Sequence, residues 1–153
     1  MAEAKLAPNL PGWMVEHANR YISSGGTDGH LYQMTQPGRP QITVPSLLLT
    51  TTGRKSGEKY IFPLFYGEVD GAYLVVASKG GAPKHPIWYL NLAANPEVEV
   101  QVGTRKVKAK ARTVTGPERA RLWQEALKFW PPYADYQQKT EREIPVVLLE
   151  PIG

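Results

Sequence analysis

Two basic, glycine-marked loops interrupt the stretch that decides the fold, residues 47–92, which reads LLLTTTGRKSGEKYIFPLFYGEVDGAYLVVASKGGAPKHPIWYLNL. The first loop covers residues 51–57 and the second covers residues 77–86. Each follows an apolar run typical of a strand. Both put cations and small residues at a strand end, where a phosphate or carboxylate can reach backbone N–H groups. The rest of the chain is expected to build a barrel that holds these loops side by side.

The composition is that of one globular domain. The chain has 153 residues, of which 42% are hydrophobic and 21% are charged. Its net charge of +4 and pI of about 9.3 suit an anionic ligand, a nucleic acid or an anionic membrane surface. Because there is no cysteine, disulfides, thiol catalysis and thiolate-bound metals are excluded.

Neither a metal site nor a membrane span is expected. The three histidines, His17, His30 and His85, lack metal-ligand spacing, and they offer no catalytic triad. No apolar run is long enough to cross a bilayer, and residues 1–11 lack the pattern of a secretory signal. We expect a cytoplasmic protein, with peripheral contact to the inner membrane face left open.

Apolar patterns predict about six strands. They cover residues 44–52, 60–66, 73–77, 97–102, 106–112 and 144–150. The fourth and fifth strands alternate strictly between apolar and polar residues, as half-buried strands do. Asp70-Gly71 is a hairpin signal, and Pro63 marks an edge, a bulge or a place where strand pairing opens.

Helical periodicity predicts three or four helices. Residues 12–21 form a weakly amphipathic helix that either packs across the domain, touches lipid or covers a substrate pocket. Pro86 suits the first position of a second helix, Pro117 opens the clearest one, and residues 133–139 form a short last one. Residues 1–11 look frayed, and residues 23–40 read as a loop that suits a mobile flap.

These elements favour an α+β, mainly β, fold: a small mixed barrel whose mostly antiparallel strands are interrupted by helices. A doubly wound sheet fits less well, because it needs strands and helices in regular alternation. We divide the chain into residues 1–40, an N-terminal helix and flexible loop, and residues 41–153, the cofactor-binding barrel.

The first loop offers an anion clamp. Arg54 can grip a phosphate or carboxylate through two parallel hydrogen bonds, Lys55 adds a point charge, and Ser56 adds a hydroxyl. The simpler interpretation is a solvated hairpin tip, where glycine and lysine are common.

The second loop carries the stronger signal. Gly80 and Gly81 let backbone N–H groups converge, Lys79 and Lys84 bring charge, and the helix that opens at Pro86 presents its positive end. The loop is neither a Walker motif nor a dinucleotide fingerprint. A flexible loop before a helix start is the alternative.

Several aromatic and basic residues outside the loops admit two interpretations. Trp88 is core or flanks a planar ring, and Tyr133 and Tyr136 are surface packing or a lid over an aromatic substrate. The basic face of residues 106–112 is solvated or attracts a polyanion. No carboxylate pair suits acid–base chemistry, so a bound cofactor would perform the difficult step.

Three motifs in order carry a resemblance: LLTTTGRKSG at residues 48–57, VVASKGGAPKHPIWYLNL at residues 75–92, and Asn95-Pro96 before an alternating strand. Together they resemble the deazaflavin-dependent nitroreductase family of actinobacteria, over roughly residues 45–151. The resemblance implies a split β-barrel related to FMN-binding flavin reductases. It also implies coenzyme F-420, an 8-hydroxy-5-deazaflavin with a phospholactyl–polyglutamate tail, and hydride transfer to quinones, nitroaromatics or other activated conjugated acceptors.

The resemblance also implies residue roles. Arg54, Lys55, Ser56 and Lys79 would meet the phosphate and acidic tail, together with the backbone of Gly80 and Gly81. Ser78, Tyr133 and Tyr136 would face the substrate. The deazaflavin ring would be lined by strand residues and closed in by helix residues: Tyr60, Ile61, Phe62, Pro63, Val76, Ala77, Ser78, Ile87, Trp88, Tyr89, Leu90, Asn91 and Tyr133. Family members often carry a basic residue where this chain has Tyr60, and Phe65 has no hydroxyl to offer a substrate.

The leading hypothesis is therefore an F-420-dependent reductase of quinone-like substrates. A non-catalytic F-420 carrier, an FMN-dependent reductase of the same fold and a nucleic-acid-binding module are the alternatives. We expect no nucleic-acid partner, because no aromatic residues interleave with the lysines of residues 106–112. The sequence leaves open the physiological substrate and whether the protein is a monomer or a dimer.

Overall fold

The computed structural model describes residues 4–8, 10–34 and 41–152. These described residues form nine strands, four α-helices and one 3₁₀ turn. The strands are β1 (Lys5–Leu6), β2 (Leu31–Met34), β3 (Ile42–Thr52), β4 (Lys59–Phe65), β5 (Gly67–Val69), β6 (Ala72–Val76), β7 (Glu97–Val102), β8 (Arg105–Thr113) and β9 (Val146–Pro151). The helices are α1 (Gly12–Ser23), α2 (Ile87–Ala94), α3 (Gly116–Phe129), α4 (Tyr133–Gln138) and the 3₁₀ turn η1 (Lys79–Gly81).

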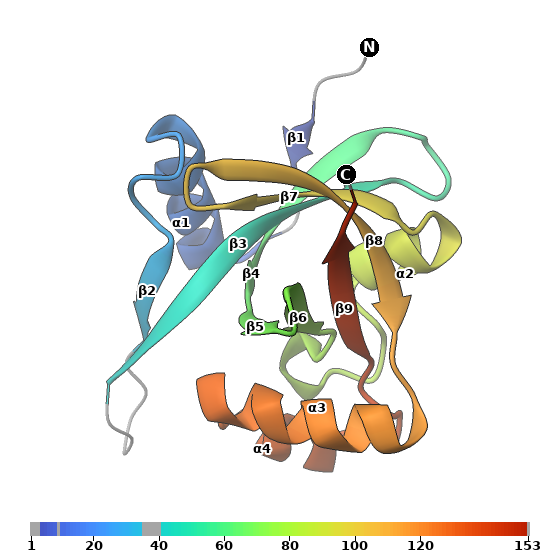
Figure 1. Cartoon of the computed structure of the whole chain (residues 1–153). Helices are drawn as coiled ribbons and strands as arrows, with labels where there is room; N and C mark the ends of the chain where they lie inside the picture. Colours follow the sequence, from blue (N-terminus) through green and yellow to red (C-terminus); the bar gives the residue numbers. More distant parts are fainter. Residues whose placement is uncertain (1–3, 9, 35–40, 153) are drawn as a thin grey trace.

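One curled sheet forms the body of the protein (Figure 1). Its strand order is β1-β4-β3-β7-β8-β9-β6-β5, and β2 pairs with β3 beside this path. Only β1 and β4 pair in parallel among the described strands; the other pairs are antiparallel. The sheet curls without closing, which confirms the predicted mainly β, split-barrel fold.

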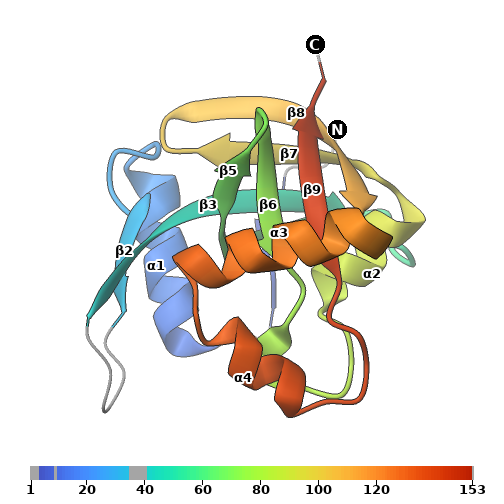
Figure 2. The same cartoon turned by 60° about the horizontal axis from the view of Figure 1, so that its bottom comes forward.

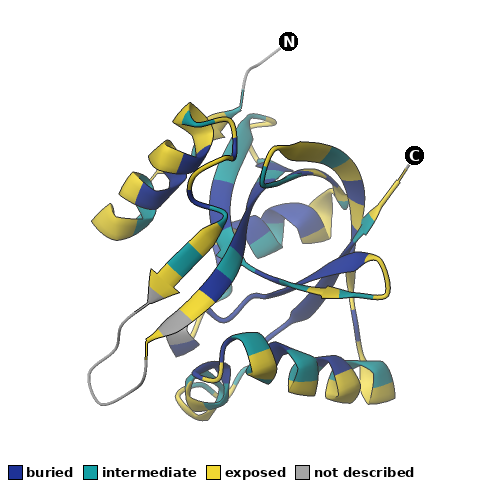
Figure 3. Ribbon diagram, turned by 60° about the vertical axis from the view of Figure 1, so that its left-hand side comes forward, coloured by how far each residue is buried: buried dark blue, intermediate teal, exposed yellow. Residues whose placement is uncertain are grey.

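The core has two main layers, because β6 and β9 are buried on both faces (Figure 3). One face of these strands, with Tyr73, Val75, Val147 and Leu149, packs inside the curl against residues of β3 and β7. The opposite face packs against α3 and α4, in a second cluster that includes Leu122. Burial on both sides explains why these strands read as continuous apolar runs rather than alternating ones.

The first helix packs on the outer side of β3, as one of its predicted interpretations has it. Tyr21 is fully buried with Ala18 and Leu48. Its hydroxyl accepts a hydrogen bond from the Gly103 backbone N–H at 2.6 Å and lies 3.1 Å from the Ser46 carbonyl oxygen. Burial raises the pKa of Tyr21, so the phenol stays neutral and joins α1 to the sheet.

Three short strands escaped the sequence prediction. Residues 1–11 were expected to be frayed, yet β1 lies there and pairs with Tyr60 and Ile61 of β4. Residues 23–40 were expected to be a loop, yet they contain β2; residues 35–40 of the predicted flap lie outside the described residues. The estimate of about six strands was too low because β1, β2 and β5 have only two to four residues each.

Two proline predictions had different outcomes. Pro63 pairs with Leu48 of β3 and lies beyond the end of the β1–β4 pairing, which stops at Ile61, so of the three predicted alternatives the edge position is confirmed. Pro86 is the N-cap of α2 rather than its first residue, because its ψ of 152° is extended. Among the described residues, no helix is both long and apolar enough to cross a membrane.

Candidate functional site

Helix α2 lies between the two basic loops and contacts both. On one side, the Asn91 amide nitrogen donates to the Thr51 hydroxyl at 3.1 Å, and the Asn91 amide oxygen accepts from the Arg54 backbone N–H at 3.2 Å. Asn91 is only 2% exposed. Because both halves of its amide are used in a buried place, this side chain sets the position of the first loop against α2.

The first loop is a tight turn in which polar groups form hydrogen bonds with residues next to them in the chain. The Ser56 hydroxyl accepts from the Glu58 backbone N–H at 3.1 Å, and the Tyr60 hydroxyl donates to the Glu58 carboxylate at 2.6 Å. A Cβ added at Gly53 would lie 2.6 Å from the Ser56 hydroxyl oxygen, so a larger residue there would displace Ser56. Hydrogen bonds from Tyr60 and then Lys5 lower the pKa of Glu58, which follows the loop and pairs with Lys5 at 3.2 Å.

The second loop is packed closely against α4, as Figure 2 shows for the 3₁₀ turn. Lys79 adopts a left-handed φ of 48°, which is uncommon for a residue other than glycine. Gly81 has φ 86°, and a Cβ there would lie 2.7 Å from the Tyr136 carbonyl oxygen. The glycine is therefore required by both the backbone conformation and the approach of α4.

Arg142, which was not among the residues predicted from the sequence, binds the backbone of the second loop. Its guanidinium donates to the carbonyl oxygens of Ala77 at 3.2 Å, Ser78 at 2.7 Å and Ala82 at 2.9 Å. It also donates to Nδ1 of His85 at 3.0 Å. No local pattern marks Arg142 in the sequence, because these partners lie 57 to 65 residues away along the chain.

His85 joins the second loop to α2. Its ring lies 5.0 Å from the ring of Tyr89, centroid to centroid, and the Tyr89 hydroxyl is 3.2 Å from the Thr113 hydroxyl. Burial and then the nearby Arg142 charge lower the pKa of His85, so the imidazole is neutral near pH 7. Helix α2 thus contacts the first loop through Asn91 and the second loop through Tyr89.

The residues predicted to line a cofactor ring lie at different depths. Phe62, Ala77 and Trp88 are buried in the inner core, whereas Ile87 is 56% exposed at the start of α2. Ser78 is buried at the end of β6, and its hydroxyl makes no hydrogen bond to another described residue. Of the remaining predicted ring contacts, Tyr60, Ile61, Tyr89 and Leu90 are partly buried, and Pro63, Val76 and Asn91 are buried.

The two tyrosines that were expected to face a substrate differ in burial, although their rings are in edge-to-face contact with centroids 6.2 Å apart. Tyr133 is 5% exposed and packs against Trp123 and Phe129 in the second core cluster, where burial raises the pKa of its hydroxyl. In this conformation Tyr133 therefore does not face solvent. Tyr136 is half-buried beside Gly81, with the Lys139 ammonium 5.7 Å from its ring, so it is the member of the pair that borders the second loop.

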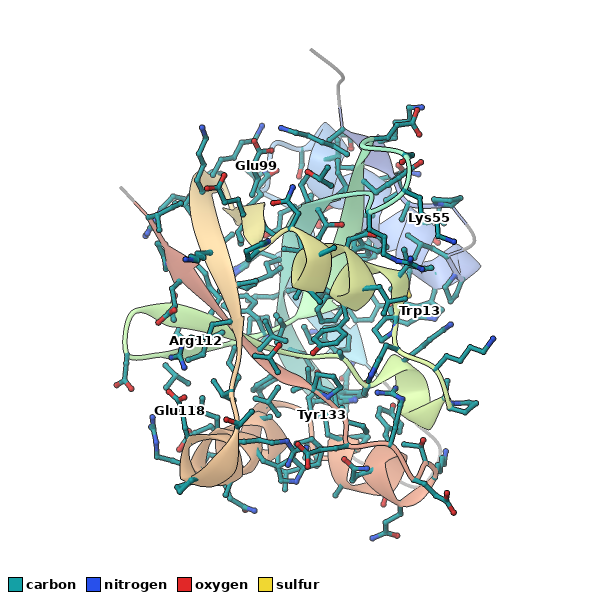
Figure 4. The ribbon with its side chains drawn as sticks, turned by 90° about the vertical axis from the view of Figure 1, so that its right-hand side faces the viewer. Trp13, Lys55, Glu99, Arg112, Glu118 and Tyr133 are labelled. Atoms are coloured by element: carbon teal, nitrogen blue, oxygen red, sulfur yellow. The ribbon has the colours of Figure 1, made fainter. Side chains whose placement is uncertain are left out.

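The loop cations differ from Lys5, Lys59 and Arg112, which are paired with carboxylates. Arg54, Lys55, Lys79 and Lys84 are exposed, and none forms an ion pair with a carboxylate of the described residues. Figure 4 shows Lys55 at the outer end of its loop and Arg112 beside Glu118, with which Arg112 pairs at 2.7 Å. The loops therefore present positive charge that the described side chains do not neutralise.

A hollow of about 230 Å³ lies between β3, β7 and β8, where Lys59, Glu97, Glu99 and Lys108 are among its lining residues. Its cations and carboxylates alternate, so it suits an anion less well than the loops do. The lining of this hollow includes strand residues that adjoin the first loop, but it includes no residue of the second loop.

The curled, open sheet is the arrangement of a split-barrel protein, and its loops carry uncompensated cations. The chain belongs to the F420H(2)-dependent quinone reductase family, whose model matches residues 13–151. The family prediction is thereby confirmed, and with it the expectation of an enzyme class that uses coenzyme F-420. The family description specifies quinones as acceptors.

Individual relatives agree with this assignment. An F420H(2)-dependent quinone reductase of Mycobacterium tuberculosis is 43% identical over 140 residues, which cover 87% of this chain and 86% of the relative. A solved F420-H2 dependent reductase (FDR-A) is 51% identical with a TM-score of 0.65, over 69% of this chain and 94% of its own. Another solved structure, described as a domain-swapped dimer, is 45% identical with a TM-score of 0.67, over 90% of this chain and 97% of its own.

Proposed function

We propose that this chain reduces quinones with reduced coenzyme F-420 held between its two basic loops. The observation that carries the proposal is the bridge that α2 makes between them, through Asn91 to the first loop and through Tyr89 to the second. The two loops with their uncompensated cations are thus both positioned by contacts with one helix, which suits binding of a long polyanionic tail.

The residues fit the chemistry of this cofactor. Lys79, Arg54 and Lys55 supply charge for a phosphate and several carboxylates, and a guanidinium can bind either group in a bidentate manner. Ser56 and Tyr60 already bond within the first loop, so we assign them to its shape more than to direct binding of the tail. Val76, Ala77 and Ser78 border the ring at the end of β6, where the buried sheet gives way to the second loop.

When bound, the reduced deazaflavin supplies a hydride to the quinone. The protein then has to orient the acceptor and stabilise the negative charge that develops on its oxygen. Ser78 suits this task, because its hydroxyl has no partner among the described residues and can donate to the acceptor oxygen. Tyr136 is the second donor that we propose; Tyr133 would serve only if α4 moved away from α3.

Fluorescence titration with oxidised F-420 tests binding, and no binding at micromolar cofactor would overturn the proposal. Anaerobic mixing of reduced cofactor with menadione tests turnover. A carrier without activity would bind F-420 but leave the rate at that of the free cofactor. An absorbance spectrum of the purified protein shows whether FMN is bound in its place, and nitroaromatic acceptors can be compared with menadione in the same assay.

Peripheral contact with the inner membrane face is a second candidate property, because lipid-soluble quinones are found there. Trp13 is 43% exposed and Leu31 is 63% exposed, and the Trp13 ring lies 5.4 Å from that of Tyr32. Exposed aromatic and apolar side chains of this kind bind at a lipid interface. Co-sedimentation with anionic vesicles should fall when Trp13→Ser and Leu31→Ser are combined, and unchanged sedimentation would argue against contact.

A further inference from the structure

Arg142 makes an unusual set of contacts for a half-buried arginine. It lies between α4 and β9, and its guanidinium donates to four acceptors, three backbone carbonyl oxygens and one imidazole nitrogen. All four acceptors belong to residues 77–85, so a single side chain holds the beginning, the middle and the end of the second loop. By comparison, Arg119 donates to one carbonyl oxygen, that of Ile144, at 2.8 Å.

The charge of Arg142 is not neutralised locally. None of the ion pairs among the described residues includes it. Burial lowers the pKa of Arg142, yet a guanidinium remains protonated at any physiological pH. A partly buried cation held only by dipoles is costly without a counter-charge. An anion bound on the other side of the loop would supply that charge.

The loop that Arg142 holds is strained. Lys79 has a left-handed φ of 48°, and such a conformation persists only where its surroundings impose it. On one side α4 imposes it, through the contact between Gly81 and Tyr136. On the other side Arg142 binds the carbonyl groups of Ala77 and Ser78, which immediately precede Lys79.

Arg142 also determines which nitrogen of His85 carries the proton. A guanidinium has donors and no acceptor, so Nδ1 of His85 must accept the hydrogen bond at 3.0 Å. The proton of the neutral ring is therefore on Nε2. Nε2 has no hydrogen-bond partner within the described parts of the chain, and the ring it belongs to packs on Tyr89.

We infer that Arg142 is a positioning residue that preforms the second loop for the phosphate-bearing tail of the cofactor and sets His85 as an N–H donor at the start of α2. The inference rests on the function proposed above. It goes further because it assigns tail recognition to a residue that contacts the cofactor only through the loop. If Arg142 only stabilised the fold, its removal would not weaken binding of the tail more than binding of the ring.

The test compares two ligands, F-420 and the same deazaflavin without its phospholactyl–glutamate tail. Arg142→Met should weaken F-420 binding by at least about tenfold, the effect of one lost charge-assisted hydrogen bond, and weaken binding of the tail-less ligand several-fold less, because only Ala77 and Ser78 of the contacts it loses border the ring. Arg142→Lys should recover only part of the loss, because lysine lacks the planar fork. Arg119→Met is the matched control and should change neither affinity.

Equal losses for the two ligands, or no loss for either, would overturn the inference. Failure of the wild-type protein to bind F-420 would instead refute the proposed function. A second measurement needs no cofactor: ¹⁵N NMR of the His85 imidazole should show the Nε2–H tautomer in the wild type and a mixture of tautomers in Arg142→Met. The same tautomer in both proteins would refute the assignment of His85.

Discussion

The protein has two basic regions, and only one of them is suited to hold an anion. On β8, the cations point out from alternate positions, and the register places Lys108 opposite Glu99 and Lys110 opposite Glu97 of β7. Lys108 and Lys110 form no close ion pair, but each has a carboxylate residue across the sheet. In the two loops, Lys79, Arg54 and Lys55 have neither a facing strand carboxylate nor an ion pair among the described residues.

The number of lysines in a region therefore says little about whether an anion binds there. Opposite charges on facing strands stabilise a sheet and cancel its field at a distance. Cations on tight loops stay exposed to a ligand, because the turn has no facing strand to supply carboxylates.

The largest expected effect separates the two regions directly. Lys79→Ala should weaken F-420 binding by about 1.5 to 3 kcal/mol, or roughly 10- to 100-fold, because a charge-assisted contact is lost. Lys108→Ala should change the affinity less than about twofold, since Lys108 already faces Glu99. Fluorescence titration of both variants measures this, and equal losses would contradict the assignment of the anion site to the loops.

The next effect concerns how the first loop is held. Asn91→Ala leaves the Thr51 hydroxyl and the Arg54 N–H without their buried partner. We expect a loss of about 1 to 3 kcal/mol in the free energy of unfolding, measured in urea. F-420 affinity should fall as well. Asn95→Ala is the control, because Asn95 is exposed at the end of the same helix; similar losses in both variants would argue against the bridging role of Asn91.

A charge reversal on β7 should remove the carboxylate that faces Lys108 and leave the cations of β8 uncompensated. Glu99→Lys removes the exposed ion pair with Lys59 at 3.4 Å and places a lysine opposite Lys108. The stability loss should be small, about 0.5 kcal/mol. Weak, salt-sensitive retention on heparin should appear. Glu16→Lys makes the same change in net charge at an exposed position of α1. The prediction fails if heparin retains both variants equally.

The smallest effect is the pH dependence of the second loop. The pKa of His85 is lowered in the folded protein, so the unfolded chain binds more protons below pH 6.5 and stability falls as the pH falls through this range. A protonated ring also cannot accept from Arg142. Since the ring is partly open to solvent, the loss should be less than about 1 kcal/mol.

Urea unfolding between pH 7.5 and 5.5 measures this dependence, and His85→Asn should flatten it. His17 contributes in the same direction, because burial lowers its pKa as well. In His85→Asn, the free energy of unfolding should therefore still rise with pH, but with a smaller slope than in the wild type. An unchanged slope in that variant would show that His85 does not contribute.

Local pattern was sufficient for most of the sheet and for the identity of the loops. Continuous apolar runs predicted β3, β6 and β9, strict alternation predicted β7 and β8, and Asp70-Gly71 predicted the hairpin between β5 and β6. The strands of two to four residues were missed, because so short a segment has no period to detect. Their pairing partners, distant in sequence, make them strands.

The sequence predicted the loops of the candidate site, but not the residues that hold these loops in place. Motif and charge identified Lys79 and Arg54, and the same motif named Asn91 without its role as a bridge. Nothing local distinguishes Arg142 from the other arginines. Tyr133 and Tyr136 are three residues apart in one helical segment, yet the packing of α3 buries one and leaves the other beside Gly81.

By itself, the sequence determined which residues carry charge, which strands have two buried faces, and that two glycine-marked loops follow buried strands. These are properties of neighbours along the chain, governed by periodicity and backbone preference. Only the tertiary structure decided which cations stay without a carboxylate, which tyrosine lies inside, and which arginine holds the second loop. Those outcomes depend on how the elements pack against one another; the contacts of Arg142, for example, join residues 57 to 65 positions apart, which chain folding alone brings within hydrogen-bond distance.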